Sequence, residues 1–541
     1  MNHTWWKEAV AYQIYPRSFQ DSNGDGMGDL PGVLSRLDHL QSLGVNVVWL
    51  CPMYKSPQDD NGYDISDYQD IHAEFGTMED FDRLLGAMHE RGMKLIVDLV
   101  INHTSDEHRW FIESRDPANP KHDWYIWRDG KAGREPNNWE SIFGGSAWKL
   151  DEQSGQYFLH LFSTRQPDLN WENLEMRGEV YKMIRWWLDK GVDGFRIDAI
   201  SHMKKEPGLP DLPNPQGKPY VPSFPFHMNV PGVLDYLREI CRETFAHYDV
   251  MTVGEANGVS SEDANEWIGD SPEKLNMLFQ FEHLGLWNTD PTKRIELAKL
   301  KEVLTRWQKC GVWNALYVEN HDIPRVISKW GDTGNFWRES ATSIAALYFL
   351  MRGTPFIYQG QEIGMTNTEF TALQDFNDVS AKNFFRAKRA EDWSDERILA
   401  ELGPTSRDNA RTPMQWDSSP QAGFTSGKPW LKVNPNFSRI NVAAQEKNPR
   451  SILNFYRALA RLRRENPVFV HGEYELLLAD HAQVFAYERR LGEERVAVVC
   501  NLSGAEAEVP LTGELLLGNY EGDTAKYWPY ECRVIRLSGA P

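Results

Sequence analysis

The sequence predicts an α/β fold: a (β/α)8 TIM barrel with a subdomain inserted after the third strand and an antiparallel β domain at the C-terminal end. The first observation is a series of eight short apolar segments separated by loops and helical patterns: residues 11–16, 45–50, 94–100, 194–198, 250–255, 275–281, 314–320 and 355–359. Strands that alternate with helices indicate a parallel sheet, and eight such strands close a barrel. The second observation is that polar residues follow the C-terminal ends of these segments, where barrel enzymes build their sites: Asp98, Arg196, Asp198, Glu255, Asn320, His321, Asp322 and Gln359.

Helical patterns lie between several of the apolar segments. Amphipathic stretches at residues 78–91 and 178–190 predict barrel helices. Residues 366–411 form a long, charged segment that we expect to be helical in part. The last barrel helix is predicted from the apolar positions Ile452, Leu453, Phe455, Tyr456, Leu459 and Leu462. These patterns assign residues 1–103 and 172–465 to the barrel domain.

The connection after the third strand, residues 104–171, is far longer than ordinary loops. Such loops in compact domains are usually lids or small subdomains, so we predict an inserted subdomain over the barrel mouth. A stabilising insertion remote from any site is the alternative. The Pro-rich, polar residues 201–230 predict a second long loop on the same rim.

The sequence pattern changes from helical to strand-like after residue 465. Residues 484–487 and 495–501, joined by residues 491–494, predict antiparallel strands. We therefore expect residues 466–541 to form a small β-sandwich-like domain.

Composition limits the classes of partner. Charged residues make up 25% and hydrophobic residues 41% of the 541 residues, which is typical of globular proteins. The formal net charge of −20 argues against nucleic acid or an anionic membrane as a partner. The 21 Trp, 20 Tyr and 25 Phe fit either a large core or stacking on ligands such as sugar rings.

Location is predicted from targeting and cysteine patterns. The first residues show no signal-peptide pattern, and no apolar run is long enough to span a membrane. The five cysteines are scattered and odd in number, so a disulfide framework is not expected. A cytoplasmic protein is the expectation.

Two charged residues interrupt the apolar segment 194–198. Arg196 and Asp198 are two positions apart and therefore share one face of the strand. An unpaired buried charge is costly, so these residues either pair structurally or belong to a site.

An early loop carries oxygen-bearing side chains at alternating positions, Asp21-Ser-Asn23-Gly-Asp25-Gly-Met27-Gly-Asp29. Such a Gly-rich loop can bind a hard cation such as Ca²⁺. The twelfth position is Gly32 rather than Glu, so the loop is not a complete EF-hand. A solitary cation loop and an Asx-rich turn both remain open.

Asp198, Glu255 and Asp322 place three carboxylates at strand ends. Glycosidic bond hydrolysis needs a pair of carboxyl groups, one of them as a proton donor. The patterns GxSxG, GxxxxGK[ST] and HExxH are absent, so serine hydrolase, P-loop and zinc protease chemistry have no support.

The spaced motifs resemble glycoside hydrolase family 13, the α-amylase superfamily. They are Asp98-Leu-Val-Ile-Asn102-His103, Gly194-Phe-Arg196-Ile-Asp198, Gly254-Glu255-Ala256-Asn257 and Glu319-Asn320-His321-Asp322. Gln166-Pro-Asp-Leu-Asn170 is similar to an additional region of the α-glucosidase and oligo-1,6-glucosidase branch. The likeness runs nearly from end to end and is closest to bacterial maltase-type α-glucosidases.

The resemblance implies roles for individual residues. Asp198 would be the nucleophile, Glu255 the general acid/base and Asp322 the transition-state stabiliser, with retention of anomeric configuration. Arg196 would hold Asp198 ionised. The residues that would grip the terminal glucose are Tyr63, Asp64, His103, His321 and Arg411; those around the scissile bond and second sugar are Phe143, Phe162, Gln166, Asn257 and Phe281.

The resemblance also implies a structural ion and no organic cofactor. Asp21, Asn23, Asp25, the carbonyl of Met27, and Asp29 match the metal loop of the branch, which implies Ca²⁺ or Mg²⁺ remote from the chemistry. The chain would act on small α-glucosides as a monomer or homodimer.

The implied activity is an exo-acting α-glucosidase on short α-1,4-linked oligosaccharides such as maltose, with or without transglucosylation. The α-1,4 linkage is inferred from Ala199, which follows the nucleophile. In the resembling branch, enzymes that prefer α-1,6 linkages tend to have Val rather than Ala at this position. The alternatives are an oligo-1,6-glucosidase, a trehalose-6-phosphate hydrolase and a sucrose-acting relative. A phosphosugar enzyme needs extra basic residues at the rim, and we expect the only obvious pair, Lys204-Lys205, to be solvated. Non-enzymatic transporter subunits of the superfamily are a further class, but they carry a membrane anchor and lack the carboxylates.

Overall fold

A computed structural model of the chain describes residues 4–287, 294–521 and 526–537. Its centre is an eight-stranded parallel sheet, which confirms the predicted barrel. The order of hydrogen-bonded neighbours is β13-β12-β10-β5-β2-β1-β15-β14. The strands are β1 (Ala11–Ile14), β2 (Val47–Leu50), β5 (Lys94–Val100), β10 (Gly194–Asp198), β12 (Met251–Glu255), β13 (Met277–Phe279), β14 (Ala315–Leu316) and β15 (Thr354–Tyr358).

Side chains connect the two ends of this order. The Tyr317 hydroxyl, just after β14, donates to the carbonyl oxygen of Gln280, just after β13, at 2.7 Å. The rings of Phe279 and Tyr317 also meet edge to face, with centroids 4.9 Å apart. β13 and β14 are shorter than the predicted segments, so aromatic packing takes the place of backbone pairing here.

Alternation along the strands divides the core in two. In β2, Val47 and Trp49 belong to the apolar cluster inside the barrel, whereas Val48 and Leu50 belong to the cluster between strands and helices. Both faces of each strand are therefore buried, as expected for a parallel sheet covered by helices.

Helices surround the barrel. Helix α4 begins with a capping box between Thr77 and Asp80 and buries Phe81, Leu84 and Met88. Helix α6 begins at Leu174, earlier than predicted, because Asn173 caps it and Gly178 lies inside it. The helices of this region are α1 (Trp5–Glu8), α2 (Leu30–Ser35), α3 (Leu37–Leu43), α4 (Met78–Glu90), α6 (Leu174–Lys190), α7 (Val233–Glu243), α8 (Ala264–Trp267), α9 (Leu297–Lys309), α10 (Val326–Lys329), α11 (Trp337–Phe349), α15 (Val442–Glu446), α16 (Ile452–Glu465) and α17 (Val468–His471).

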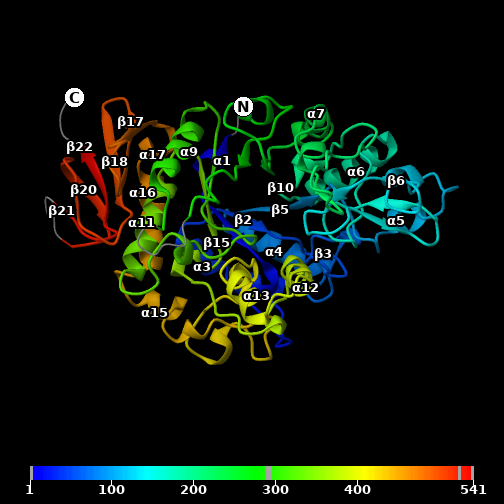
Figure 1. Cartoon of the computed structure of the whole chain (residues 1–541). Helices are drawn as coiled ribbons and strands as arrows, with labels where there is room; N and C mark the ends of the chain where they lie inside the picture. Colours follow the sequence, from blue (N-terminus) through cyan, green and yellow to red (C-terminus); the bar gives the residue numbers. More distant parts are fainter. Residues whose placement is uncertain (1–3, 288–293, 522–525, 538–541) are drawn as a thin grey trace.

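Residues 104–171 form a separate layer at one side of the barrel, coloured cyan in Figure 1. They contain α5 (Arg109–Ser114) and a three-stranded sheet ordered β6 (Trp127–Arg128), β9 (Tyr157–Leu159), β8 (Trp148–Leu150). A further strand, β7 (Trp139–Glu140), pairs with β11 (Val221–Pro222) of the 201–230 loop. The two rim segments are thus joined to each other. The exact domain boundaries stay a prediction.

Residues 366–411 supply three helices on the rim: α12 (Val379–Ala390), α13 (Asp395–Leu402) and α14 (Asp408–Arg411). Between β2 and β5, a short hairpin of β3 (Tyr54–Lys55) and β4 (Asp67–Ile71) adds a further rim element.

The C-terminal residues form an antiparallel sheet at the opposite side of the barrel from residues 104–171 (Figure 1). Its order is β16 (Glu473–Leu477), β17 (Val484–Leu491), β18 (Glu494–Asn501), β22 (Cys532–Leu537) and β20 (Gly513–Gly518), with β19 (Ala507–Glu508) and β21 (Lys526–Tyr527) as a second pair. One face packs on the barrel domain, where the Tyr487 hydroxyl donates to Leu347 O at 2.9 Å.

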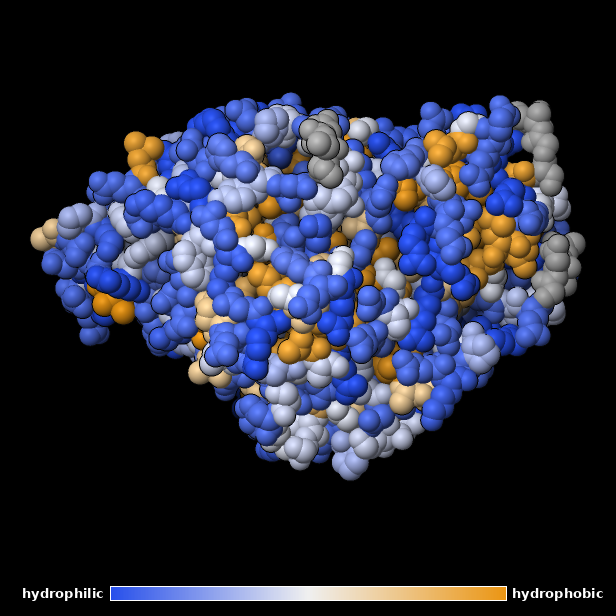
Figure 2. Space-filling model, turned by 180° about the vertical axis from the view of Figure 1, so that it is seen from behind, coloured by the Kyte–Doolittle hydropathy of each residue, from blue (hydrophilic) through white to orange (hydrophobic). Residues whose placement is uncertain are grey.

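The outer surface is mainly hydrophilic. Figure 2 shows the face opposite to that of Figure 1, with apolar side chains gathered over the C-terminal domain. Leu515 and Trp528 of that domain are 41% and 44% exposed. Within the described residues, no helix is long and apolar enough to cross a membrane, and all five cysteines are free thiols.

Candidate active site

The three carboxylates meet at the C-terminal ends of the barrel strands. Asp198 ends β10, Glu255 ends β12 and Asp322 follows β14. The charges of Asp198 and Asp322 raise the pKa of Glu255, and the charge of Asp322 raises that of Asp198. The expected gathering of these side chains at one end of the barrel is what the structure shows.

Arg196 links two of these carboxylates to a third acid. Its Nη1 lies 2.5 Å from Asp198 Oδ1 and 2.6 Å from Asp98 Oδ1, and its Nη2 lies 3.0 Å from Glu255 Oε1. The register of the sheet brings Arg196 beside Asp98 of β5. Arg196 is 2% exposed and stacks over the Trp49 ring at 5.1 Å. The pair predicted on one strand face is thus both an ion pair and part of a site.

Burial raises the pKa of these acids despite the neighbouring cation. The pKa of Asp198 rises to about 6, although Arg196 lowers it, and the pKa of Asp98 also rises to about 6. The pKa of Glu255 rises to about 7, because burial is reinforced by the negative charges of Asp198 and Asp322. Arg196 favours the ionised form of Asp198, as expected of a neighbouring cation, but the loss of hydration raises the pKa by more than Arg196 lowers it. The order is preserved, with Asp198 more acidic than Glu255.

Asp322 titrates in the opposite direction. Burial alone would raise its pKa, but His321, Arg407 and Arg411 hold it well below the usual range. Arg411 Nη2 and Arg407 Nη1 donate to Asp322 Oδ1 at 2.9 Å and 3.0 Å. Asp322 therefore stays ionised at neutral pH.

His321 is fixed by stacking and by a hydrogen bond. Its ring lies parallel to that of Tyr63, with centroids 5.2 Å apart and 5° between planes, while Tyr15 stacks on it at 6.0 Å. Gln13 Nε2 lies 2.7 Å from His321 Nδ1, so the amide donates and the neutral ring carries its proton on Nε2. That nitrogen lies 3.0 Å from Asp322 Oδ2.

His103 and Gln166 form the next part of the wall. Gln166 Nε2 lies 3.2 Å from His103 Nε2, from the Tyr63 carbonyl oxygen and from Asp60 Oδ2. Asp64 is fully buried, and its carboxylate accepts from the backbone N–H groups of Asp59 at 2.7 Å and Asp60 at 3.0 Å. Asp64 thus stabilises the turn that holds Asp60 and Tyr63 in this wall.

Two residues of this wall were missed by the sequence reasoning. Arg407 Nη2 lies 3.3 Å from Asp60 Oδ1 and also contacts Asp378. Arg407 therefore ties Asp60 to Asp322 across the mouth of the barrel. In the sequence, Asp60 belongs to an acidic pair shortly before Asp64, and Arg407 lies shortly before Arg411. Neither residue is part of a periodic pattern that would have marked it as a site residue.

Aromatic side chains line the rim. Phe162 lies 5.0 Å from the His103 ring and 5.7 Å from the Phe143 ring, and the Arg407 guanidinium lies 5.2 Å from the Phe143 ring. Phe143 and Phe162 are thus brought together with the glucose-binding candidates. Phe281 is half-buried against the cluster inside the barrel.

Ala199 and Asn257 act through their backbones. The Ala199 N–H donates to Glu255 Oε2 at 2.9 Å from a left-handed conformation (φ 47°), which is unusual for a residue other than glycine. The Asn257 carbonyl oxygen accepts from Ser201 and Asn229, each at 2.8 Å. These bonds hold the loops after β10 and β12 together beside the acids.

The expectation of a solvated Lys204-Lys205 pair was wrong. Lys205 is buried, and its Nζ lies 2.7 Å from Asp168 Oδ2 and donates to Asn102 Oδ1 at 3.0 Å. Lys204 pairs with Glu172. The buried Asp168 needs this counter-charge, so neither lysine is a free basic group at the rim.

The proposed metal loop is held by backbone hydrogen bonds. Asp21 accepts from the N–H groups of Asn23, Gly24 and Gly26 and from the Thr425 hydroxyl. The remaining side chains of the loop behave alike: Asn23 accepts from Asp25 N, Asp25 from Met27 N, and Asp29 from Ser22 N and Gly32 N. Over residues 4–287, 294–521 and 526–537, no three His, Cys, Asp or Glu side chains converge as metal ligands. This geometry fits the Asx-rich turn, and a Ca²⁺ or Mg²⁺ ion stays a prediction.

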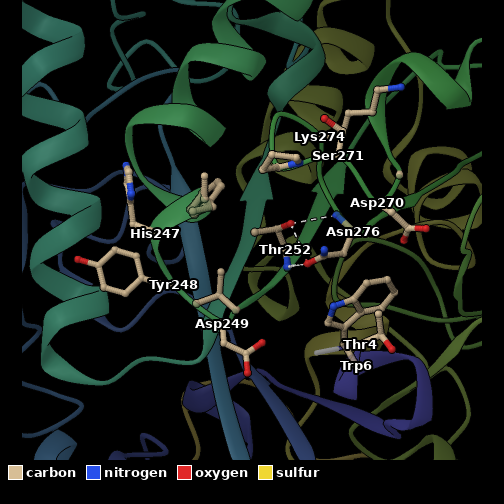
Figure 3. A pocket seen from close by; sticks show the side chains of 15 residues that line it. Thr4, Trp6, His247, Tyr248, Asp249, Thr252, Asp270, Ser271, Lys274 and Asn276 are labelled. Carbon is tan, nitrogen blue, oxygen red and sulfur yellow. Dashed lines mark hydrogen bonds between the residues drawn. The ribbon is translucent and has the colours of Figure 1, made fainter. Parts of the chain in front are cut away.

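A cavity of about 410 Å³ lies at the other end of the strands (Figure 3). Thr252 and Asn276, at the starts of β12 and β13, hydrogen-bond to each other there, at 2.8 Å between Thr252 N and Asn276 Oδ1. None of the three acids lines it. Because barrel sites lie at the opposite face, we do not assign the chemistry to this cavity.

Comparisons with known proteins show the family to which the chain belongs. Residues 13–472 match the family described as "Alpha amylase, catalytic domain", and residues 474–527 match "Maltogenic Amylase, C-terminal domain". The chain is 52% identical to "Probable oligo-1,6-glucosidase 3" of Bacillus subtilis (strain 168), with 99% of each chain covered. It is 46% identical to "Alpha-glucosidase" of Pediococcus pentosaceus, again with 99% of each chain covered. Among solved structures, trehalose-6-phosphate hydrolase of Bacillus licheniformis has a TM-score of 0.91 at 41% identity, covering 99% of this chain and 100% of that one. The chain belongs to the α-amylase family of glycoside hydrolases, family 13.

Proposed function

We propose that the protein is an exo-acting α-glucosidase that releases glucose from the non-reducing end of short α-glucosides. The observation that carries the proposal is the electrostatic asymmetry of the three acids. Asp322 stays ionised, Asp198 is more acidic than Glu255, and Glu255 holds its proton up to about pH 7. Two carboxyl groups of different acidity at one bond are the requirement for glycoside hydrolysis.

The reaction would proceed by double displacement. The Asp198 carboxylate attacks the anomeric carbon while Glu255 gives its proton to the leaving oxygen. Glu255, now ionised, takes a proton from water, and the water oxygen displaces Asp198 from the glucosyl-enzyme. Asp322 supplies negative charge near the oxocarbenium-like transition state, and Arg196 compensates the acids around it.

Exo action is supported by the wall on the far side of the terminal sugar. The Asp60–Arg407 pair and the contact of Gln166 with His103 link rim segments that are distant in sequence. Such a wall leaves space for a chain end rather than for a continuing polymer.

For the linkage, the names of the relatives favour α-1,6 over the α-1,4 expectation. The relatives at 52% and 51% identity are named as oligo-1,6-glucosidases. We therefore propose isomaltose-like α-1,6 glucosides as the preferred substrates. Maltose stays the second candidate because residue 199 is Ala rather than Val. A difference of one or two methyl groups changes the discrimination between two substrates by only about 1–3 kcal/mol, so Ala199 excludes neither linkage.

A substrate panel tests this proposal. We expect kcat/KM to be higher for isomaltose than for maltose, trehalose or sucrose. A higher kcat/KM for maltose would instead support the α-1,4 linkage inferred from Ala199. If none of the four sugars released glucose, the proposed α-glucosidase activity would be refuted. In the Ala199→Val variant, the ratio of isomaltose to maltose should rise. Because a β-branched residue is strained at φ 47°, the thermal midpoint of this variant must be measured in parallel.

The pH dependence follows from the two raised pKa values. Below about pH 6 Asp198 takes up a proton and cannot attack, and above about pH 7 Glu255 loses the proton that it must donate. We expect a narrow bell-shaped profile of kcat/KM with its maximum between these values. Because Asp198 and Glu255 titrate as a coupled pair, the apparent pKa values of the two limbs describe the pair. In Glu255→Gln, the residual hydrolysis of p-nitrophenyl α-glucoside should lose the alkaline limb. An unchanged alkaline limb would assign that titration to another group.

A further inference from the structure

Three distant segments of the chain meet behind His103, one of the residues expected to bind the terminal glucose. Asn102 and His103 follow β5. Asp168 lies near the end of the inserted segment, and Lys205 lies in the loop after β10. All four residues are buried, with exposed fractions between 0% and 7%. Polar groups that are buried together satisfy one another, so their donors and acceptors determine how each side chain is oriented.

Lys205 and Asp168 fix the orientation of the Asn102 amide. The Lys205 ammonium group has only donors; it donates to Asn102 Oδ1 at 3.0 Å and lies 2.7 Å from Asp168 Oδ2. The Asn102 amide nitrogen faces away from Lys205 and donates to Asp168 Oδ2 at 3.1 Å. In the reverse orientation, the amide nitrogen would face a donor and the amide oxygen would face a carboxylate. The buried ion pair therefore permits one orientation of Asn102.

The second N–H group of Asn102 determines where His103 carries its proton. Asn102 Nδ2 lies 3.2 Å from His103 Nδ1, so Nδ1 accepts and the proton is on Nε2. His103 Nε2 lies 3.1 Å from the Tyr63 carbonyl oxygen, which can only accept and so requires the same tautomer. Burial and the charge of Lys205 lower the pKa of His103, which lies at about 4, so the ring carries a single proton at pH 7. His103 therefore presents a donor at Nε2.

We propose that Lys205 and Asp168 are positioning residues for the substrate: through Asn102 they keep the proton of His103 on Nε2, so that His103 donates a hydrogen bond to a hydroxyl oxygen of the terminal glucose. This inference rests on the proposed α-glucosidase function and on the glucose-binding role expected of His103. With the proton on Nδ1 instead, Nε2 would be an acceptor, and the hydroxyl would have to reverse its own hydrogen bonds.

Replacing the ion pair by neutral side chains removes the constraint on Asn102. Lys205→Met alone would leave the Asp168 charge buried without its partner, which costs stability. The double variant Lys205→Met/Asp168→Asn is neutral in this region and keeps similar side-chain volumes. Its new amide nitrogen at position 168 donates toward Asn102, whose oxygen is no longer held by Lys205 and turns to accept. That oxygen then also faces His103 Nδ1 and favours the proton there.

Deoxy substrates measure the hydrogen bond of His103. We define the hydroxyl penalty as the ratio of kcat/KM for p-nitrophenyl α-glucoside to that for an analogue that lacks one glucose hydroxyl. The hydroxyl bound by His103 is the one with a penalty of about tenfold in the parent and within about twofold in His103→Ala. We expect this penalty to fall to about twofold or threefold in Lys205→Met/Asp168→Asn. The intrinsic reactivity of each analogue cancels when penalties are compared between enzymes.

A second variant tests the amide that joins the ion pair to His103. Asn102→Leu has a similar volume and leaves Lys205 paired with Asp168, but it offers His103 Nδ1 no donor. We expect the same hydroxyl penalty to fall in this variant. If the double variant lacks the cooperative unfolding of the parent, Asn102→Leu decides, and a full penalty in it overturns the inference.

Lys204→Met is the matched control. Lys204 is the adjacent lysine, but it pairs with Glu172 rather than with Asn102 or Asp168. Its hydroxyl penalties should stay within about twofold of those of the parent. The thermal midpoint of each variant is measured in parallel, because a merely structural ion pair would lower stability, and kcat/KM for all analogues alike, without selecting one hydroxyl.

The outcomes separate this inference from the proposed function. If the parent hydrolyses the α-glucoside but the double variant keeps the full penalty, or loses kcat/KM equally for every analogue, Lys205 and Asp168 do not position His103 and the α-glucosidase stands. The same holds if no hydroxyl penalty depends on His103. A parent that does not hydrolyse p-nitrophenyl α-glucoside removes the α-glucosidase and this inference with it.

Discussion

Asp198→Ala is expected to reduce kcat/KM on an α-glucoside by about 10⁴-fold or more. The side chain ends β10 beside Arg196, and its pKa lies below that of Glu255. The fold should survive. Since burial raises the pKa of Asp198 to about 6, its charge at pH 7 costs stability, and removing it should not lower the thermal midpoint.

Azide distinguishes a nucleophile from a general acid in this experiment. In Asp198→Ala, azide can occupy the space of the lost carboxylate and should form β-glucosyl azide from an activated α-glucoside. In Glu255→Ala, azide should instead attack the glucosyl-enzyme and form the α-anomer. The α-anomer from Asp198→Ala, or activity above about one hundredth of the parent, would contradict the assigned roles.

The sequence predicted the fold well because two signals acted together. Apolar segments gave the eight strands, and their polar ends marked the face of the site. The lengths of β13 and β14 were overestimated: Tyr317 is apolar but lies beyond β14, and its ring packs against Phe279 at the closure of the barrel. Aromatic packing and strand pairing look alike in a sequence.

The candidate site was predicted where spaced motifs exist and missed where contacts depend on loop packing. Asp198, Glu255 and Asp322 lie in motifs and converge, whereas Asp60 and Arg407 meet only because two rim segments fold over one another. Lys205 looked solvated because its loop is Pro-rich and polar. The packing of that loop against the inserted segment buries it beside Asp168.

Electrostatics was the least predictable property. The sequence showed that Arg196 would neighbour Asp198, which alone lowers the pKa of a carboxyl group. It did not show that Asp98 and Glu255 would share the same guanidinium, or that all of them would be buried. Burial reverses the direction of the shift, and burial is a property of the tertiary structure.

The largest effect on stability is expected from Arg196→Met. One guanidinium compensates Asp98, Asp198 and Glu255, and removing a buried partner leaves uncompensated charge that costs about 3–5 kcal/mol. Because the folded pKa values of these acids lie above their unfolded values and would rise further, the cost is present at pH 7.5 and disappears as the pH falls and the acids take up protons. The free energies of unfolding in urea of the variant and the parent should therefore differ at pH 7.5 and converge toward pH 5.

Arg196→Lys is the matched control. It keeps the charge and most of the stability but loses the planar guanidinium, so it should lose activity without the pH-dependent loss of stability. Equal stability of Arg196→Met and parent at both pH values would show that the guanidinium is not the counter-charge of the site.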